Sequence, residues 1–496
     1  MPDDVPDNAR ARLVVTLFCV FAAAVAFHGV LLPMVETGGD AVEGWFFVKK
    51  LSWGIEITDR EWNHRTVRFG ILGPAYAAAT VFGTRPWVYY VAPLLMSGIA
   101  AVLLFRLVDR RFGRSSAWLI TGAFCLFPQI HDVAAQQKPE IFSLVYVLGC
   151  ANALAAFGDT EKRAHLVVAG VWLFFAYWTK LPNLFFVPGL VALLLAEGGR
   201  AKEAALFGGT ALLLIGAENI VHVSAGQEYG RVGYTVAKHF TSKALESTDL
   251  IGLFGRYTQL TGTWALLFAA YGVAAVVTIA RRKTLTRFEQ ALVVLPLVFF
   301  VCTTFAIKSV DPLVPAQPFR DRYLSAAVPW MLLTVLIAAR AWIAERMESQ
   351  KRWLLPSVLG LATLGRLATH PVPLEEHPLR LLPDYEAEFA EAFEDGRPVF
   401  ATESRQGLRV ARNLFWSPHL NHDGEALPII RKVKSEPKYW YLVDETRWLA
   451  ESRGSRRRAV RSWRGASHLE AYRIIEEEDG KFLTDLFRLQ TAEVPR

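Results

Sequence analysis

Cysteine and charge are both scarce in this chain. Four cysteines occur in 496 residues, all of them in apolar segments, and no two form a CxxC pair. Small apolar thiols of this kind argue against a disulfide framework and against a metal site built from cysteine. They are Cys19, Cys125, Cys150 and Cys302. Charged residues make up only 20% of the chain against 52% hydrophobic residues, which is not the balance of a soluble enzyme of this length.

A signal-peptide cleavage site, internal repeats and low-complexity segments are also missing. The polar, acidic start of the chain leads directly into an apolar segment, and residues 30–33 contain no small-residue cleavage motif. We therefore expect an uncleaved first helix. The absence of a repeat also bears on function, because transporters tend to show internal repeats.

Apolar residues gather in segments of roughly 17 to 23 residues, the length needed to cross about 30 Å of hydrocarbon. The segments are residues 13–33, 86–107, 115–131, 140–157, 164–179, 183–197, 203–223, 261–280, 288–307, 324–341 and 353–369. The sequence therefore predicts an α-helical polytopic membrane protein with about eleven transmembrane helices.

Lys and Arg collect in alternate short connections between these segments. The basic connections are residues 106–114, 162–163, 200–202, 281–287 and 340–352, and Arg10 and Arg12 precede the first segment. Cytoplasmic loops carry an excess of Lys and Arg, so the pattern predicts a cytoplasmic N-terminus. The net charge of +7 is then a signal of topology and lipid contact, and not of a nucleic-acid surface.

The opposite side receives the long loops, residues 34–85, 132–139, 224–260 and 308–323. The first of them contains residues 67–82, which are apolar but short and rich in Gly and Pro. This segment could be a further span, but that would invert everything after it and spoil the charge pattern. An interfacial helix on the outer leaflet fits better.

The C-terminal part of the chain changes composition and predicts a second domain. It is charged, with strand-like residues 398–402 and 439–444 and a helix-like segment 405–415 between them. Strand, helix and strand indicate a small soluble α/β domain. We therefore divide the chain into a transmembrane module, residues 1–369, and a periplasmic α/β domain, residues 370–496.

Ionisable side chains at membrane depth are costly and are therefore candidates for a functional site. Here they stand at the outer ends of the predicted spans. They are Glu36, Asp40 and Glu43 after the first span, Asp132, Lys138 and Glu140 before the fourth, Lys180 after the fifth, and Arg320, Asp321 and Arg322 before the tenth. If the orientation were reversed, these groups would still share one side.

Acidic and basic groups that face one cavity suit sugar transfer from a lipid phosphate. A carboxylate can deprotonate an acceptor hydroxyl, and Lys and Arg can hold a phosphate leaving group as its negative charge grows. Each residue alone has a simpler explanation, because charged side chains at an interface reach water or lipid headgroups. The carboxylates also lack a fixed spacing.

The chain resembles the GT-C superfamily of polyprenyl-phosphate-sugar-dependent glycosyltransferases, which includes protein O-mannosyltransferases and the lipid A aminoarabinose transferase. Asp40, in GGDAVEGWFFVKKLSWG, stands where that superfamily has an acidic residue in the first outer loop. Glu140, with Asp132 as the alternative, stands where it has another before the fourth span. Residues 41–54 and 67–82 resemble its interfacial helices.

Three further segments carry the resemblance. The segment TKLPNLFFVPGLVALLL, which contains Lys180, is similar to the superfamily's Lys-containing turn between two helices. Arg322 and Tyr323, in DRYLSAAVPW, are similar to its RYLLPALP-like helix start. The charged tail is similar to the soluble outer domain that many members carry.

The sequence departs from the superfamily at two places. Many members have an adjacent acidic pair in the first loop, whereas here alanine follows Asp40, so a second carboxylate would be Glu43 or Glu36. His64 and Arg65 stand where relatives often have a Pro-Pro pair. Both departures leave the identity of the substrate open.

The resemblance implies an inverting transfer of a sugar from a polyprenyl-phosphate donor, of the undecaprenyl or decaprenyl type, to a cell-envelope acceptor. The acceptor would be a lipid, glycan or protein on the periplasmic face of a bacterial inner membrane. Asp40 would be the general base and Glu140 would position the acceptor or a cation. Lys180, Arg320 and Arg322 would bind the lipid phosphate. Further candidates for substrate contacts are Glu43, His64, Arg65, Asp132 and Tyr323.

Other interpretations stay open at this point. Some relatives use a divalent cation with their acidic loops, and the scattered carboxylates here do not decide it. His222, Arg231, Lys238 and His239 are weaker site candidates near the cavity entrance. A membrane transporter or lipid-linked-sugar flippase is the main rival function, although the charges lie at one interface and not at mid-membrane. A non-catalytic scaffold is the third reading.

Overall fold

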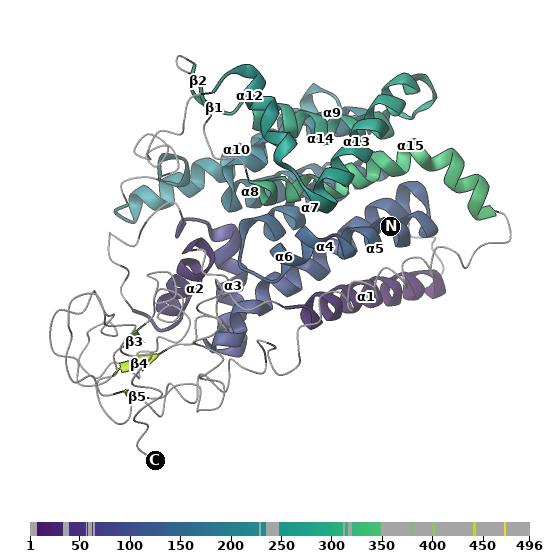
Figure 1. Ribbon diagram of the computed structural model, residues 1–496. Helices are drawn as coiled ribbons and strands as arrows, with labels where there is room; N and C mark the ends of the chain where they lie inside the picture. Colours follow the sequence, from purple (N-terminus) through teal and green to yellow (C-terminus); the bar gives the residue numbers. More distant parts are fainter. Residues whose placement is uncertain are drawn as a thin grey trace. The chain divides into compact units, whose positions relative to one another are not determined.

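The chain is described by a computed structural model, which is mostly helical (Figure 1). It describes residues 7–32, 39–55, 57, 62, 65–227, 230–234, 248–310, 313–315, 320–348, 377, 379, 400–401, 440–442 and 471–472. The chain divides into two compact units. The first comprises Met1–Leu31, Trp62–Ile71 and Pro93–Pro371, and the second Leu32–Glu61, Leu72–Ala92 and Val372–Arg496.

Helices follow one another along most of the described chain, with short 3-10 turns (η) at several junctions. Up to residue 200 they are α1 (Asp7–Val30), α2 (Gly39–Ser52), α3 (Phe69–Phe82), η2 (Pro86–Tyr90), α4 (Val91–Phe112), α5 (Arg114–Leu126), α6 (Pro128–Ala134), α7 (Pro139–Thr160), α8 (Ala164–Thr179), η3 (Leu181–Phe186) and α9 (Val187–Ala196). After residue 200 they are α10 (Ala201–Ser224), α12 (Leu250–Gly255), η4 (Arg256–Gln259), α13 (Gly262–Ala280), η5 (Arg282–Thr284), α14 (Arg287–Thr304), η6 (Asp321–Ala327) and α15 (Val328–Glu348).

Within the described part of the chain, seven helical segments are long and apolar enough to cross a membrane. They are Ala11–Val30, Pro86–Phe112, Pro139–Thr160, Ala201–Ser224, Gly262–Ala280, Arg287–Thr304 and Asp321–Arg340. The prediction of an α-helical, multi-pass membrane protein is thereby confirmed. Two further predicted spans fall on the shorter apolar helices Ala164–Thr179 and Leu181–Ala196. The last predicted span, residues 353–369, lies outside the described residues.

The predicted span 115–131 is not one helix in the structure. Helix α5 ends at Leu126, Phe127 has an extended backbone with ψ of 121°, and Pro128 begins α6. The residue before a proline is driven out of the helical region by the proline ring, so the break follows from Pro128. With 13 residues, α5 is about 20 Å long and shorter than the hydrocarbon layer.

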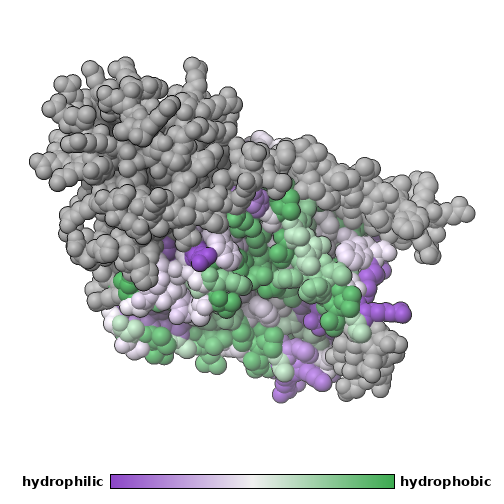
Figure 2. Space-filling view, turned by 90° about the horizontal axis from the view of Figure 1, so that it is seen from below, coloured by the Kyte–Doolittle hydropathy of each residue, from purple (hydrophilic) through white to green (hydrophobic). Residues whose placement is uncertain are grey.

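Apolar side chains cover the outside of several helices. Figure 2 shows a broad apolar area on one face of the described residues, with hydrophilic side chains at its border. Exposed large apolar residues occur on α1, α10 and α13, for example Phe18, Leu213 and Leu266. A soluble monomer rarely exposes apolar surface over whole helices, whereas lipid tails cover such surface in a membrane protein.

Helix α7 lies at the centre of the first unit (Figure 1). It is apolar on all sides, and 94% of its membrane-spanning segment is buried inside the protein. Helices α8 and α9 and the turn η6 pack against it, α10 packs on α8, and α14 packs on α9 and α15. A helix that is buried all round needs no polar face, so its sequence shows no amphipathic stripe.

Glycines allow two of these helix pairs to approach closely. A β-carbon at Gly189 of α9 would lie 2.8 Å from the Cα atom of Leu295 in α14. One at Gly170 of α8 would lie 2.8 Å from the carbonyl oxygen of Phe207 in α10. Small residues at helix crossings are typical of membrane bundles, in which packing replaces the hydrophobic effect between helices.

The predicted loop 308–323 contains most of a short β-hairpin. Strand β1 (Ile307–Val310) pairs antiparallel with β2 (Leu313–Pro315). After this hairpin the chain enters η6 and α15.

The second unit contains α2, η2 and a small sheet. Trp45 of α2 packs edge-on against Tyr89, with ring centroids 6.3 Å apart. Strand β3 (Phe400–Ala401) pairs in parallel with β4 (Trp440–Leu442), and β5 (Ala471–Tyr472) pairs antiparallel with β4. Strands β3 and β4 fall within the two predicted strands of the tail. The predicted helix 405–415 lies outside the described residues, and the predicted domain 370–496 stays a prediction.

Helices are present at both segments that resemble interfacial helices. They are α2 and α3, each of 14 residues. Helix α3 belongs with Ala164–Thr179 and Leu181–Ala196 among the shorter apolar helices, so the interfacial position of residues 67–82 stays a prediction.

Candidate functional site

Four of the predicted site residues lie together in the first unit, and they come from three elements. Glu140 is in the first turn of α7, Lys180 follows the last residue of α8, and Arg322 and Tyr323 are in η6. Lys180 Nζ lies 3.0 Å from Glu140 Oε1 and 3.6 Å from the centre of the Tyr323 ring. The Arg322 guanidinium lies 5.5 Å from the same ring centre and is close enough to act electrostatically on Glu140.

Prolines determine where these helices begin and end. Pro139 occupies the first turn of α7, where its missing N–H has no helical partner to lose, so α7 begins directly before Glu140. Pro182 follows Lys180 by two residues and cannot continue α8, because it lacks the N–H that the helix would require. Lys180 is therefore extended, with φ of −155° and ψ of 123°.

The Glu140 carboxylate is buried, with 2% of its side chain exposed. Its Oε1 atom accepts from Lys180, whereas Oε2 accepts no hydrogen bond from any residue that the structure describes. Buried polar atoms without a hydrogen bond are rare in native proteins, and they often mark a functional site. The Oε2 atom is therefore positioned to accept a hydrogen bond from a ligand or to bind a cation.

A buried polar chain joins the start of α7 to the end of α8. Asn183 Nδ2 donates to Ser143 Oγ over 2.8 Å and to the Ala176 carbonyl over 2.7 Å. The Ser143 hydroxyl donates in turn to the Pro139 carbonyl. These bonds hold the two helix ends in one arrangement, and this arrangement allows the Lys180 ammonium to reach Glu140.

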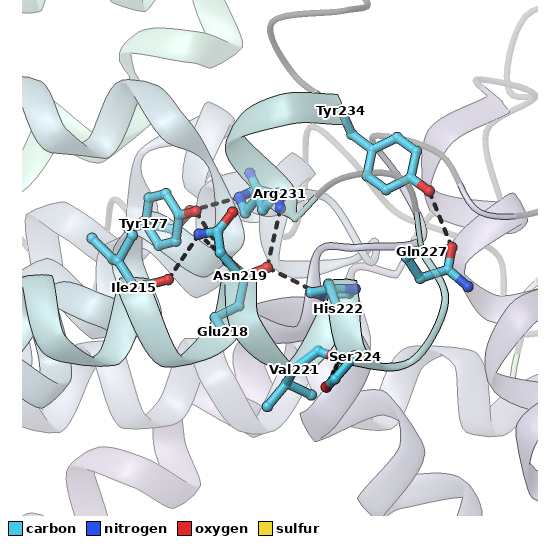
Figure 3. A network of polar contacts seen from close by, with 10 residues as sticks. All are labelled: Tyr177, Ile215, Glu218, Asn219, Val221, His222, Ser224, Gln227, Arg231 and Tyr234. Carbon is cyan, nitrogen blue, oxygen red and sulfur yellow. Dashed lines mark hydrogen bonds and ion pairs between the residues drawn. The ribbon is translucent and has the colours of Figure 1, made fainter.

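A second network holds the end of α8 from the other side (Figure 3). Arg231 donates through Nε to the Tyr177 carbonyl over 2.8 Å and through Nη2 to the Thr179 carbonyl over 3.0 Å. Glu218 of α10 accepts from the Arg231 backbone N–H and lies 3.1 Å from His222 Nε2. Its other oxygen accepts from the Tyr177 hydroxyl.

Arg231 is 2% exposed, so its charge has lost most of its water. Burial lowers the pKa of Arg231, and the nearby Arg68 lowers it further, whereas Tyr177 and Glu218 raise it. A buried charge is tolerated when hydrogen bonds and an opposite charge compensate it. The two helix carbonyls and the Glu218 carboxylate provide that compensation here.

Gly70 at the start of α3 fits directly against the end of α8. A β-carbon at this position would lie 2.9 Å from the Phe175 carbonyl oxygen and 2.9 Å from the Thr179 backbone nitrogen. The Gly70 carbonyl also accepts a hydrogen bond of 2.7 Å from the Tyr146 hydroxyl of α7. The absence of a side chain therefore allows three helices to meet beside Lys180.

The remaining predicted residues differ in what the structure shows of them. Asp40 lies in the first turn of α2, and its side chain is outside what the structure describes. Glu43, on the same helix, is half-buried, as are Arg65 in the turn before α3 and Asp132 on α6. Arg320 is exposed and immediately precedes η6. His64, Lys238 and His239 lie outside the described residues.

Sequence reasoning missed Glu218, Asn183 and Ser143. Glu218 had a signal, since it is an ionisable residue inside an apolar segment and stands four residues before His222, on the same helix face. Asn183 and Ser143 had none, because polar uncharged residues in apolar helices are common and only the packing of α7 against α8 brings these two together.

Among the described residues, no group of three or more His, Cys, Asp and Glu side chains could hold a metal ion. The Asp40 side chain is outside that set. A divalent cation shared by the acidic loops therefore stays a prediction.

Two solved structures of ArnT from Cupriavidus metallidurans resemble this chain. The structure bound to undecaprenyl phosphate is 13% identical with a TM-score of 0.53, and the match covers 83% of this chain and 85% of that one. The apo structure is 12% identical with a TM-score of 0.54, and the match covers 88% of this chain and 94% of that one. The chain has the GT-C fold.

Sequence comparison gives a shorter match. The family of dolichyl-phosphate-mannose-protein mannosyltransferases matches residues 75–221, which include Glu140, Lys180 and Glu218. No curated protein matches the sequence. The predicted resemblance to the GT-C superfamily is therefore confirmed as a resemblance of fold, and the matched segment contains the α7–α8 half of the charged cluster.

Proposed function

We propose that this chain is a membrane glycosyltransferase that moves a sugar from a polyprenyl-phosphate donor to a cell-envelope acceptor on the periplasmic face. The observation that carries the proposal is the cluster of the buried Glu140 with the half-buried Lys180, Arg322 and Tyr323 at one end of membrane helices with the GT-C fold. In this cluster Lys180 bonds Glu140 and the Arg322 guanidinium lies near it, so two cations stand beside one buried carboxylate. Lys and Arg side chains in this arrangement suit an anionic ligand group.

The chemistry that we propose divides between the acidic and the basic residues. An acceptor hydroxyl oxygen attacks the anomeric carbon from the face opposite the phosphate, and Asp40 takes the hydroxyl proton. The bond between the anomeric carbon and the phosphate oxygen breaks, and the polyprenyl phosphate leaves with the electron pair. Lys180 and Arg322 stabilise the negative charge that grows on this phosphate. Attack from the opposite face inverts the anomeric configuration.

The other residues would have supporting roles. Glu140 Oε2 would orient the acceptor hydroxyl or a cation, because it is buried and accepts no bond from the described residues. Tyr323 holds the Lys180 ammonium over its ring by a cation–π contact. Arg320 is exposed and would meet the phosphate from the aqueous side. Glu43, Arg65, Asp132 and His64 remain candidates for contacts to the sugar or the acceptor.

The proposal also includes a location. The Arg-rich connections would be cytoplasmic and the Glu140 cluster periplasmic, in a bacterial inner membrane. In the structure Glu140 is at the first turn of α7, and Arg110 and Arg111 pair with Asp159 at its last turn. The basic loops and the cluster therefore lie at opposite ends of one membrane-spanning helix, as this topology requires.

The test uses purified wild-type protein, Asp40→Asn and the neighbouring control Glu43→Gln in detergent. Each is incubated with a panel of radiolabelled polyprenyl-phosphate sugars and a membrane extract as acceptor source. We expect the wild type to transfer one sugar, and Asp40→Asn to bind that donor but lose transfer by about 1,000-fold or more, within the range that general base catalysis contributes. Glu43→Gln should lose much less transfer than Asp40→Asn, because Glu43 would contact the sugar or the acceptor without taking the proton.

Two other outcomes would change the proposal. Full activity in Asp40→Asn with loss in Glu43→Gln would keep the enzyme class and move the base to Glu43. A wild-type protein that neither binds nor consumes any donor would contradict the transferase, and lipid-linked-sugar flux into liposomes would then test the flippase alternative.

A further inference from the structure

The end of α8 is held by side chains that approach it from two directions. Lys180 follows the last residue of this helix, and its backbone is extended. The last carbonyls of a helix have no partner within the helix and need other donors. The Ala176 carbonyl accepts from the Lys180 N–H and from Asn183. The Tyr177 and Thr179 carbonyls both accept from Arg231.

Arg231 reaches these carbonyls from a distant part of the chain. It follows the turn after α10, about 50 residues beyond Lys180, and its guanidinium uses two different nitrogens for the two carbonyls. A guanidinium is a planar fork with fixed directions, so two bonds from it define the orientation of the helix end. Its positive charge also faces the negative end of the α8 dipole.

Arg231 is itself held in place by α10. Glu218 accepts from its backbone N–H over 3.1 Å, and Glu218 is oriented by His222 at 3.1 Å and by Asn219 at 3.0 Å. Asn219 directly follows Glu218 in α10 and His222 lies one turn further on. Figure 3 shows Arg231 and His222 converging on the Glu218 carboxylate. The network therefore links α10 to the residue directly before Lys180.

We infer that Arg231, held by Glu218, is a positioning residue for Lys180: it fixes the end of α8 so that the Lys180 ammonium lies where a phosphate group of the substrate binds. The inference rests on the proposed function, because that function gives Lys180 its ligand. Arg231 acts through the backbone of residues 177 and 179, and not by contact with the substrate.

The direct test measures binding of polyprenyl monophosphate, which requires no sugar transfer. Binding is measured for wild type, Arg231→Met, Lys180→Met and the double variant in detergent. Arg231→Met should weaken binding roughly 10-fold when Lys180 is present, because the ammonium is no longer held in position. In the Lys180→Met background the same change should alter binding by less than about 2-fold.

This dependence on Lys180 separates positioning from general stability. A residue that only stabilises the bundle would weaken binding by the same factor in both backgrounds, and that result would overturn the inference. Unchanged binding in Arg231→Met would also overturn it. Arg231→Lys keeps the charge but loses the fork, so we expect an intermediate loss that again disappears in the Lys180→Met background.

Arg111→Met is the matched control. Arg111 also bonds a helix carbonyl, that of Ala155 over 3.1 Å, and a carboxylate, that of Glu197 over 2.6 Å, but at the other end of α7. It should lower thermal stability without changing phosphate binding. If Arg231→Met does not fold, the pair Arg231→Met with Glu218→Gln removes both partners together and is measured in the same way.

The outcomes also distinguish this inference from the proposed function. If the wild type binds polyprenyl phosphate but transfers no sugar, the transferase fails while the binding cycle still decides the role of Arg231. If the wild type binds no polyprenyl phosphate, both fail.

Discussion

The two ends of α7 differ in how their charges are balanced. At the end near Thr160, Arg110 and Arg111 pair with Asp159, and Arg111 also lies 2.6 Å from Glu197. At this end each of the two arginines is within ion-pair distance of a carboxylate. At the other end the Glu140 carboxylate accepts from Lys180 and lies near Arg322, whose backbone N–H donates to Asp321.

The burial of the carboxylates also differs between the two ends. Burial raises the pKa of Glu197, and Arg111 opposes that shift by pairing with it. Glu140 is more deeply buried than Asp159, yet one of its oxygens accepts no bond from the described residues. Ion pairs between partly exposed side chains serve the structure, whereas a deeply buried carboxylate oxygen that accepts no bond from the described residues indicates a ligand contact.

The largest contrast should come from removing one cation at each end. Lys180→Met should lower sugar transfer by about 100-fold, because a charge-assisted hydrogen bond to the leaving phosphate contributes roughly 1.5–3 kcal/mol. Arg110→Ala removes a cation from the compensated end and should change transfer by less than about 3-fold. Initial rates at saturating acceptor measure both. Equal losses at the two ends would contradict the distinction between them.

Substituting one carboxylate at each end of α7, Glu140 or Glu197, tests the same difference. Glu140→Gln should lower kcat roughly 10-fold and leave polyprenyl-phosphate binding unchanged or tighter, because Lys180 loses its competing carboxylate. Glu197→Gln should lower the melting temperature and leave kcat near the wild-type value, because it leaves Arg111 without one of its buried partners. Weaker phosphate binding in Glu140→Gln would show that Glu140 supports the phosphate site instead of opposing Lys180.

The smallest effect should come from two glycines on α3. Gly70→Ala places a methyl group 2.9 Å from backbone atoms of α8, so the end of that helix must shift and phosphate affinity should fall by about 3- to 10-fold. Gly73→Ala is the control, because a β-carbon there meets nothing within 4 Å among the described residues. The measurement is the Kd for polyprenyl phosphate. Equal values for the two variants would show that the α3–α8 contact does not control Lys180.

The membrane architecture was largely readable from the sequence. Apolar length predicts the spans because each backbone polar group in lipid must bond within its own helix, and α1, α7, α10 and α13 lie where this rule places them. The prediction was wrong at residues 115–131, where Pro128 splits the segment into α5 and α6. Pro128 is visible in the sequence, so this break could have been predicted from the chain alone.

The site was readable only in part. Glu140, Lys180 and Arg322 could be selected because charge near membrane depth is rare, and the structure places them together. Their contact distances could not be predicted, since they depend on how α7, α8 and η6 cross. Asn183 and Ser143 were invisible for the same reason, because an uncharged polar residue gains a role only from its neighbour across the helix interface.

The sequence by itself determined the class of protein, the helices and the residues whose charge requires an explanation. These follow from local quantities, namely the length of apolar segments, the positions of prolines and the cost of burying charge. Only the tertiary structure decided that Lys180 pairs with Glu140 and that Arg231 caps α8, the helix that ends directly before Lys180. These contacts join residues 40 and about 50 positions apart, and no local property of the chain specifies which distant donor reaches a given helix end.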